Sequence, residues 1–162
     1  MFQVGDVLIL LKELAHTDAN VAYHLWVSVF QYAWDSLRED TVRKKLVMPM
    51  NTLLQKDYHI RQKDKRPNVI QSLLEGFYLS SPQSKLPSQL ISFLGKNYNA
   101  WHISTSILEN HVMLFPREIS CYEALDDLRC MLNEEDLCYG LWKKKLITTE
   151  MRAGLSLVQH RY

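Results

Sequence analysis

The chain has 162 residues, of which 47% are hydrophobic and 23% charged, so it is long enough to bury a conventional core. Its 19 basic and 18 acidic residues leave a formal net charge of +1, which excludes a general attraction to nucleic acid or to an anionic membrane as the main basis of binding. The 3 cysteines lack Cys-x-x-Cys spacing and are typical of free thiols in a reducing compartment, which argues against a disulfide framework.

The amino-terminal third is predicted to form three helices, because apolar residues recur there at helical spacing and two-residue alternation is rare. The apolar run Val7–Leu11 is too short to span a bilayer, and it lacks the basic lead and cleavage site of a signal peptide. Asp18, after Thr17, can cap the second helix. The three helices are expected over about Phe2–Ala15, Asp18–Leu37 and Glu39–Leu54.

A polar and basic segment follows, at about residues 55–66, and is predicted to be a linker. Pro67 suits the first turn of the next helix, which ends before Ser80, and Pro87 can open the one after it. Gly95 and Asn97 predict a break in that helix. The remaining helices are expected over about Tyr98–Phe115, Glu118–Leu132, Glu134–Lys145 and Thr149–His160.

This pattern predicts an all-α fold of about nine helices with short connections. Because many of the helices are apolar over more than one side, stacked antiparallel hairpins fit the pattern better than a single four-helix bundle. The expected architecture is an α-solenoid segment similar to tetratricopeptide or HEAT repeats. The last predicted helix has no polar capping element, so residues 1–162 are expected to be a single helical-repeat segment of a much larger protein.

The predicted helix Glu134–Lys145 has a clear amphipathic design. Asn133 is expected to cap its start, and its acidic first turn suits the positive end of the helix dipole. Leu137 and Leu141 are spaced to share one face. Gly140 lies inside the helix at a cost of about 1 kcal/mol relative to alanine, which suggests that another helix passes close by.

The histidines are scattered, and their nearest grouping with a carboxylate is His102, Glu109 and His111. Glu109 and His111 are two residues apart on one helix and face different ways, so no metal site is expected there. The acidic pair Asp126-Asp127 lacks calcium-loop spacing. We therefore expect no metal site and no cofactor.

The cysteines are candidate nucleophiles, but each would need a neighbouring base to activate it. Cys130 and Cys138 each have apolar helical neighbours, where burial would raise the thiol pKa and make the thiol inert. The sequence also contains no glycine-rich phosphate loop and no Gly-x-Ser-x-Gly elbow. It therefore predicts no catalytic residues and no enzymatic activity.

The most positive part of the chain is the predicted linker, which is a weak candidate for binding an acidic partner. Tyr58 is its only aromatic residue, and Asp57 and Asp64 reduce its net charge, so direct nucleic-acid binding is not expected. A solvated loop is the simpler interpretation. The candidate residues are Arg61, Lys63, Lys65 and Arg66.

Several stretches, in collinear order, give the chain a recognisable family resemblance. They are Leu14–Asp18, Leu25–Val27, Leu94–Trp101, Ser106–His111, Leu132–Asp136, Gly140–Trp142 and Gln159-His160. With these stretches the chain resembles the TRRAP family, very large transcription-associated pseudokinases related to the phosphatidylinositol-3-kinase-like kinases. The resemblance is to the helical FAT region ahead of the kinase-like domain.

The resemblance implies a non-catalytic scaffold in the nucleus, within histone acetyltransferase complexes of the SAGA type and the MYST-acetyltransferase type. Its implied partners are proteins: transcription activators, other subunits of these chromatin-modifying complexes and the rest of the same solenoid. It implies tetratricopeptide-like hairpins in an arc around the kinase-like domain, and no cofactor. Two alternatives stay open: the FAT segment of an active kinase of the same superfamily, and a small helical enzyme in which a cysteine meets a histidine.

Overall fold

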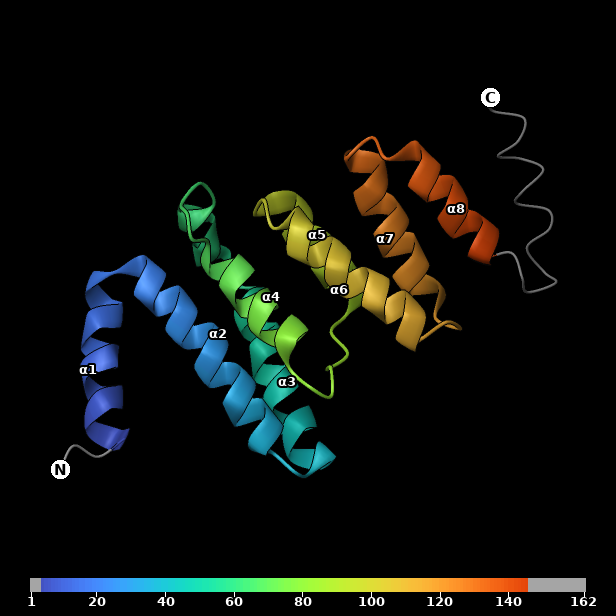
Figure 1. The fold of residues 1–162 in the computed structure, drawn as a ribbon. Coiled ribbons are helices and arrows are strands. Elements are labelled where there is room, and N and C mark those ends of the chain that lie inside the picture. The colour runs from blue at the N-terminus through green and yellow to red at the C-terminus, as the bar shows by residue number, and fades with distance from the viewer. Residues whose placement is uncertain (1–3, 146–162) are drawn as a thin grey trace.

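A computed structural model describes residues 4–145 of the chain (Figure 1). Across that range it contains helices and their connections, which confirms the all-α prediction. The predicted helix at about Thr149–His160 lies outside the described residues. The elements are α1 (Val4–Thr17), α2 (Ala19–Ser36), α3 (Asp40–Leu54), the short 3-10 helix η1 (Asp57–Gln62), α4 (Val69–Leu79), α5 (Ser88–Asn97), α6 (Trp101–Leu114), α7 (Ile119–Met131) and α8 (Glu135–Lys145).

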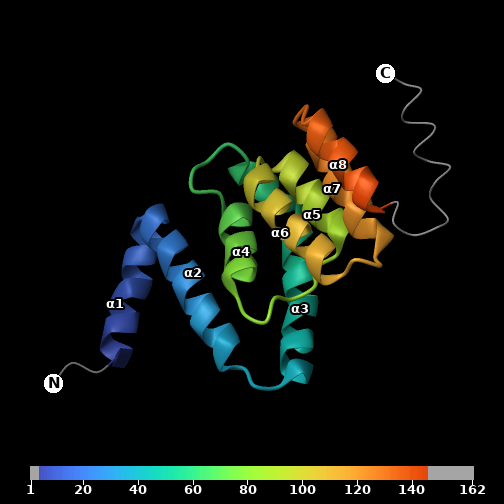
Figure 2. The ribbon, with the colours of Figure 1, turned by 45° about the vertical axis from the view of Figure 1, so that its right-hand side comes forward.

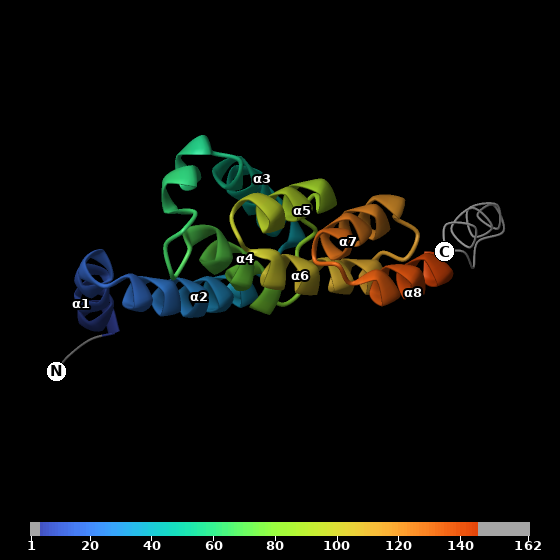
Figure 3. The same ribbon diagram turned by 90° about the horizontal axis from the view of Figure 1, so that it is seen from above.

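The helices follow one another along an elongated stack that runs from α1 to α8 (Figures 1 and 3). Sequence neighbours α1 and α2 pack together, as do α5 and α6, α6 and α7, and α7 and α8. Contacts of α2 with α4, of α4 with α6 and of α5 with α7 join these pairs into one body. Serial stacking of this kind confirms the predicted helical solenoid.

Two of the predicted helix starts are set by residues that the sequence analysis singled out. Asp18 caps α2, and its Oδ1 accepts hydrogen bonds from the amides of Asn20 at 2.7 Å and Val21 at 3.4 Å. Pro87 immediately precedes α5, where its fixed φ suits the entry into a helix. Pro67 was expected in the first turn of α4, but it lies one residue before the cap of that helix, Asn68.

Asn133 ends α7 and does not cap α8, contrary to the sequence expectation. Its φ of 58° is in the left-handed region, which asparagine tolerates better than most residues. The Asn133 amide donates to the carbonyl of Cys130 at 3.2 Å, and the Glu134 amide donates to the carbonyl of Arg129 at 3.1 Å. This pair of bonds is the Schellman arrangement, which satisfies the last carbonyls of a helix.

An aromatic row on α2 packs against α4, and the two helices run side by side in Figures 1 and 2. Trp26, Phe30 and Trp34 stack in succession, with ring centroids 5.1 and 5.7 Å apart. Phe77 of α4 meets Phe30 edge-on at 5.1 Å. At Gly76 the helices come so close that a Cβ would lie 3.1 Å from ring atoms of both Trp26 and Phe30. A glycine therefore permits this crossing.

The break predicted at Gly95 and Asn97 comes at Asn97, where α5 ends, and Gly95 lies inside α5 at a second close approach. A Cβ there would lie 2.9 Å from the Cβ of Ser104 in α6 and 3.2 Å from Leu128 in α7. Gly140, in contrast, has no atom of residues 4–145 within 4 Å of a built Cβ, so the expected close helix does not pass there within the described part of the chain. Leu141 is buried, whereas Leu137 is 48% exposed, so they do not share a buried face.

The segment predicted as a linker contains η1, and part of it is packed. His59 of η1 is buried, and its Nε2 lies 2.8 Å from the carbonyl oxygen of Leu53 at the end of α3. Leu54, the last residue of α3, is buried in the core. These contacts hold the start of the segment against the body, while the residues that follow η1 are exposed.

One hydrophobic core extends along the stack from Trp34 in α2 to Leu141 in α8. Helix α1 adds no buried residue to that core, and it contacts the rest of the body through α2. Five of its large apolar side chains are between 48% and 63% exposed: Val7, Leu8, Ile9, Leu10 and Leu14. An exposed apolar surface of this kind marks a place for another protein segment.

Candidate interaction surface

The basic segment is held in place by Asn68, which lies at the start of α4 and is 1% exposed. Its Oδ1 accepts from the amide of Ile70 at 2.8 Å, which caps the helix. Its Nδ2 donates to the carbonyls of Lys63 at 3.2 Å and Tyr98 at 3.1 Å. A single buried side chain therefore connects the basic segment, the start of α4 and the joint between α5 and α6.

The four predicted partner-binding cations are all exposed. Arg66 folds back on its own loop and donates from Nη1 to the carbonyl of Lys65 at 2.8 Å. Within the part of the chain that the structure describes, none of the four forms an ion pair. Two large apolar side chains beside them, Tyr58 and Ile60, are 53% and 66% exposed. We call the basic loop surface the set Tyr58, Ile60, Arg61, Lys63, Lys65 and Arg66.

The chemistry of the basic loop surface is mixed. Exposed lysine and arginine side chains attract carboxylates at a range set by salt, about 8–10 Å near physiological ionic strength. Exposed tyrosine and isoleucine side chains add apolar contact area. Asp57 and Asp64 are also exposed and weaken the field without removing the excess of positive charge. An acidic segment that also carries apolar residues would complement this surface.

A groove lies between α3 and the connection from α4 to α5, with a volume of about 590 Å³. Lys44 and Met48 of α3 line one side, and Pro82 and Lys85 line the other. Lys85 is already engaged, since it pairs with Glu118 and lies 5.1 Å from the centroid of the Phe115 ring. This groove is therefore less available to an acidic partner than the basic loop surface.

His102, Glu109 and His111 do not converge on a common point. Glu109 accepts a hydrogen bond at 2.7 Å from Nη2 of Arg129, a buried arginine on α7. His111 is fully buried, and burial lowers its pKa below the usual 6.5, so its ring is neutral at pH 7. His102 is exposed. Among the described residues, these three form no metal-binding group.

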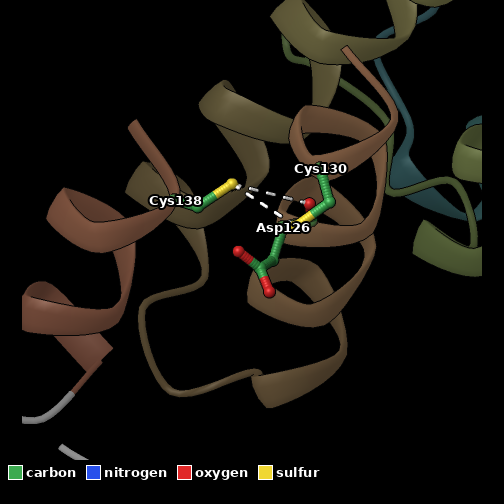
Figure 4. Close-up of side chains that lie close together, drawn as sticks. All are labelled: Asp126, Cys130 and Cys138. Atoms are coloured by element: carbon green, nitrogen blue, oxygen red, sulfur yellow. Dashed lines mark hydrogen bonds between the residues drawn. The ribbon is translucent and has the colours of Figure 1, made fainter. Parts of the chain in front are cut away.

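The structure does bring together two thiols and a carboxylate that the sequence analysis kept apart (Figure 4). The sulfurs of Cys130 and Cys138 are 3.6 Å apart, and a carboxylate oxygen of Asp126 lies within 4.8 Å of both. Cys138 is buried, as expected, but Cys130 is exposed. Cys121 lies elsewhere and is fully buried, with its sulfur 3.1 Å from the Ser88 hydroxyl.

This grouping was missed because its members come from two helices. Asp126 and Cys130 are one helical turn apart on α7, a spacing that does place two side chains on one face. Cys138 joins them only because the turn at Asn133 reverses the chain and lays α8 against α7. The i, i+4 pair was the one signal in the sequence. None of the cysteine sulfurs forms a hydrogen bond with a histidine within residues 4–145, so the structure offers no Cys–His pair for the enzyme alternative.

Sequence comparisons connect this fold to known proteins. Residues 1–79 match the family model for the Tra1 HEAT repeat ring region. The chain is 36% identical over 161 residues to the SAGA complex/NuA4 acetyltransferase complex subunit TRA1 of Saccharomyces cerevisiae, and 34% identical over 156 residues to Tra1 of Schizosaccharomyces pombe. These alignments cover 96% and 92% of the chain. The chain belongs to the Tra1/TRRAP family.

More distant relatives extend the family to animals. The human transformation/transcription domain-associated protein is 23% identical over 181 residues, an alignment that covers 99% of the chain. The chain spans about 4% of the length of either yeast relative and 5% of the human one. Between Val4 and Lys145, none of the helices has the length and apolarity that a bilayer crossing requires.

Proposed function

We propose that this chain is a non-catalytic segment of the helical scaffold of a nuclear transcription coactivator, a subunit of histone acetyltransferase complexes. The observation that carries the proposal is the alignment of 92–96% of the chain, at 34–36% identity, with subunits named for the SAGA and NuA4 complexes. The stacked helices suit this role, because helical repeat proteins present extended surfaces to protein partners. The segment holds other parts of the complex in position and binds partner proteins, while other subunits carry out the acetyl transfer.

We further propose that the segment includes part of the HEAT repeat ring. The matching family model covers residues 1–79, which correspond to α1 through α4. The FAT-region placement, predicted for residues 1–162, is kept in this proposal only for the helices that follow residue 79. An image of the intact parent protein tests this division, because α1–α4 would lie in the ring and α5–α8 in the helical arc beside the kinase-like domain.

The basic loop surface is the proposed contact for transcription activators. Activation domains are commonly disordered segments in which acidic and hydrophobic residues alternate. Arg61, Lys63 and Lys65 would attract the acidic residues, and the exposed side chains of Tyr58 and Ile60 would contact the hydrophobic ones. Because the charges are exposed, the attraction would act mainly on the association rate and would weaken as salt rises.

Purification of the intact parent protein tests the membership of the complex. The parent protein, tagged and isolated from nuclear extract, is expected to bring down acetyltransferase-complex subunits identified by mass spectrometry. The proposal would be refuted if none of these subunits were recovered with the parent protein. Intact kinase catalytic-loop and metal-binding motifs downstream in the parent gene would favour the kinase alternative instead.

A charge-reversal experiment tests the activator contact. The double variant Lys63→Glu, Lys65→Glu of the parent protein is expected to bind an acidic amphipathic peptide at least about tenfold more weakly, because both cations are lost and replaced by repulsion. The matched control is Lys12→Glu, Lys45→Glu, which makes the same charge change at exposed lysines of α1 and α3. Equal binding by both double variants would refute the contact, as would binding of duplex DNA in place of the peptide.

A further inference from the structure

Two sulfur atoms and one carboxylate meet where α7 packs against α8 (Figure 4). Asp126 and Cys130 project from α7 one turn apart, and Cys138 comes from the first turn of α8. All three potential donor atoms lie within 4.8 Å of one another. The fold therefore creates here a small set of ligands of mixed sulfur and oxygen type.

The separation of the two sulfurs matches the geometry of a shared metal ion. Zinc–sulfur bonds are about 2.3 Å long, so two thiolates on one tetrahedral zinc ion lie about 3.8 Å apart. The sulfurs of Cys130 and Cys138 are 3.6 Å apart. An ion could thus bind both cysteines with a shift of a few tenths of an ångström.

Asp126 provides a second, independent observation. Its Oδ1 atom is buried, yet it has no hydrogen-bond partner among the described residues. Native proteins seldom leave a buried carboxylate oxygen without a partner, and a bound water molecule or a bound ion usually satisfies such an atom. This carboxylate lies beside the two sulfurs.

We propose that Asp126, Cys130 and Cys138 form a binding site for a divalent transition-metal ion of the zinc type. Thiolate ligands select zinc over the hard ions magnesium and calcium. Cys130 is exposed, so a water molecule can complete a four-coordinate site from the solvent side. The bound ion would link the end of α7 to the start of α8 and so fix the angle between these two helices.

A disulfide between the same two cysteines fits the structure less well. Burial, together with the neighbouring Cys130 and Asp126, raises the pKa of the Cys138 thiol to about 12, which keeps this thiol protonated at pH 7. Thiol–disulfide exchange needs the thiolate and an oxidant. A metal ion removes this barrier, because each coordinating thiol gives its proton to solvent as its sulfur binds the ion.

Cobalt substitution tests the site in the purified 162-residue chain. The chain is reduced, freed of metal with a chelator and titrated with Co²⁺, whose thiolate charge-transfer and tetrahedral ligand-field bands report on sulfur coordination. We expect one ion per chain, displaced by Zn²⁺, and a higher melting temperature of the Zn²⁺-bound chain. Cys130→Ser and Cys138→Ser should each weaken the charge-transfer bands, and Asp126→Asn should lower the affinity by about tenfold or more.

The control variant is Cys121→Ser, which removes the thiol that lies outside the site and should leave the cobalt spectrum unchanged. Circular dichroism of each variant checks that the helices persist. Absence of the thiolate bands in the folded wild-type chain would overturn the proposal. Bands that persist in the double variant Cys130→Ser, Cys138→Ser, or an intramolecular disulfide in place of bound metal, would also overturn it.

Discussion

Asn68 donates a hydrogen bond from its Nδ2 to the carbonyl oxygen of Tyr98, 3.1 Å away, and thereby ties the start of α4 to the end of α5. The same buried side chain caps α4 and holds the carbonyl of Lys63 in the basic segment. The position of the basic loop surface therefore depends on one asparagine at a distance from its charges.

Asn68→Ala is expected to lower the free energy of unfolding by about 2–3 kcal/mol, because it removes a helix cap and leaves buried carbonyls unpaired. Urea denaturation followed by circular dichroism measures the change. Gln71→Ala is the matched control, since Gln71 bonds the neighbouring carbonyl of Asn99 at 2.8 Å from a more exposed position. The control should cost no more than about 0.5 kcal/mol. Equal losses in the two variants would contradict this role of Asn68.

Alanine at Gly76, Gly95 and Gly140 should separate close packing from helix propensity. Gly95→Ala places a Cβ 2.9 Å from Ser104, so we expect a loss of about 1–3 kcal/mol from overpacking. Gly76→Ala meets two aromatic rings at 3.1 Å and should also destabilise the chain. Gly140→Ala meets nothing and should stabilise it by about 0.5–1 kcal/mol. Thermal melts rank the three variants by melting temperature. A higher melting temperature for Gly95→Ala than for the wild-type chain would show that α5 is not tightly packed there.

The buried His111 should make stability depend on pH. Burial lowers its pKa below 6.5, and among the charges that face it Lys85 lowers the pKa further while Glu118 opposes the shift. The unfolded chain therefore binds more protons than the folded chain as pH falls below about 6.5, so the free energy of unfolding should fall from pH 7 towards pH 5. Glu118, whose pKa is lowered by Lys85, loses its stabilising charge only below about pH 4.5.

His111→Gln removes the titrating group and should flatten the stability curve between pH 7 and pH 5. Urea midpoints at several pH values provide the measurement. His102→Gln, at an exposed histidine of the same helix, should leave the slope of the wild-type chain unchanged. Parallel curves for wild type and His111→Gln would show that His111 carries no part of the pH dependence.

The isolated chain is expected to self-associate at high concentration, because α1 exposes a large apolar surface. Ile9 and Leu10 are 63% and 58% exposed, so Ile9→Lys, Leu10→Lys should lower the apparent mass in light scattering after gel filtration. The control Met48→Lys, Met113→Lys introduces the same charges at exposed methionines of α3 and α6. A wild-type chain that stays monomeric at high concentration would contradict the expectation.

Features that depend on one helix at a time could be predicted from the sequence. The apolar spacing located α1 to α8 within a few residues, and Asp18 and Pro87 act at the helix starts as expected. Helix starts and ends of this kind are determined by residues that are close together in the sequence. The fold class followed from the same signals, because short connections force successive helices to pack together.

Features that depend on two helices could not be predicted. Gly140 and Gly95 look alike in the sequence, yet only Gly95 meets a neighbouring helix. Asn133 suits both a helix start and a left-handed helix end, and packing of α8 on α7 selects the second. The same packing brings Cys138 to Cys130, and no spacing along the chain encodes that contact.

Cryo-electron microscopy of the intact parent protein, purified from nuclei with its partners, tests the scaffold proposal most directly. We expect α1 to α8 to lie within a larger helical array, in particles that also contain an acetyltransferase, with Ile9 and Leu10 covered by another helix. A map in which the apolar side chains of α1 face solvent, or in which no acetyltransferase subunit accompanies the protein, would contradict it.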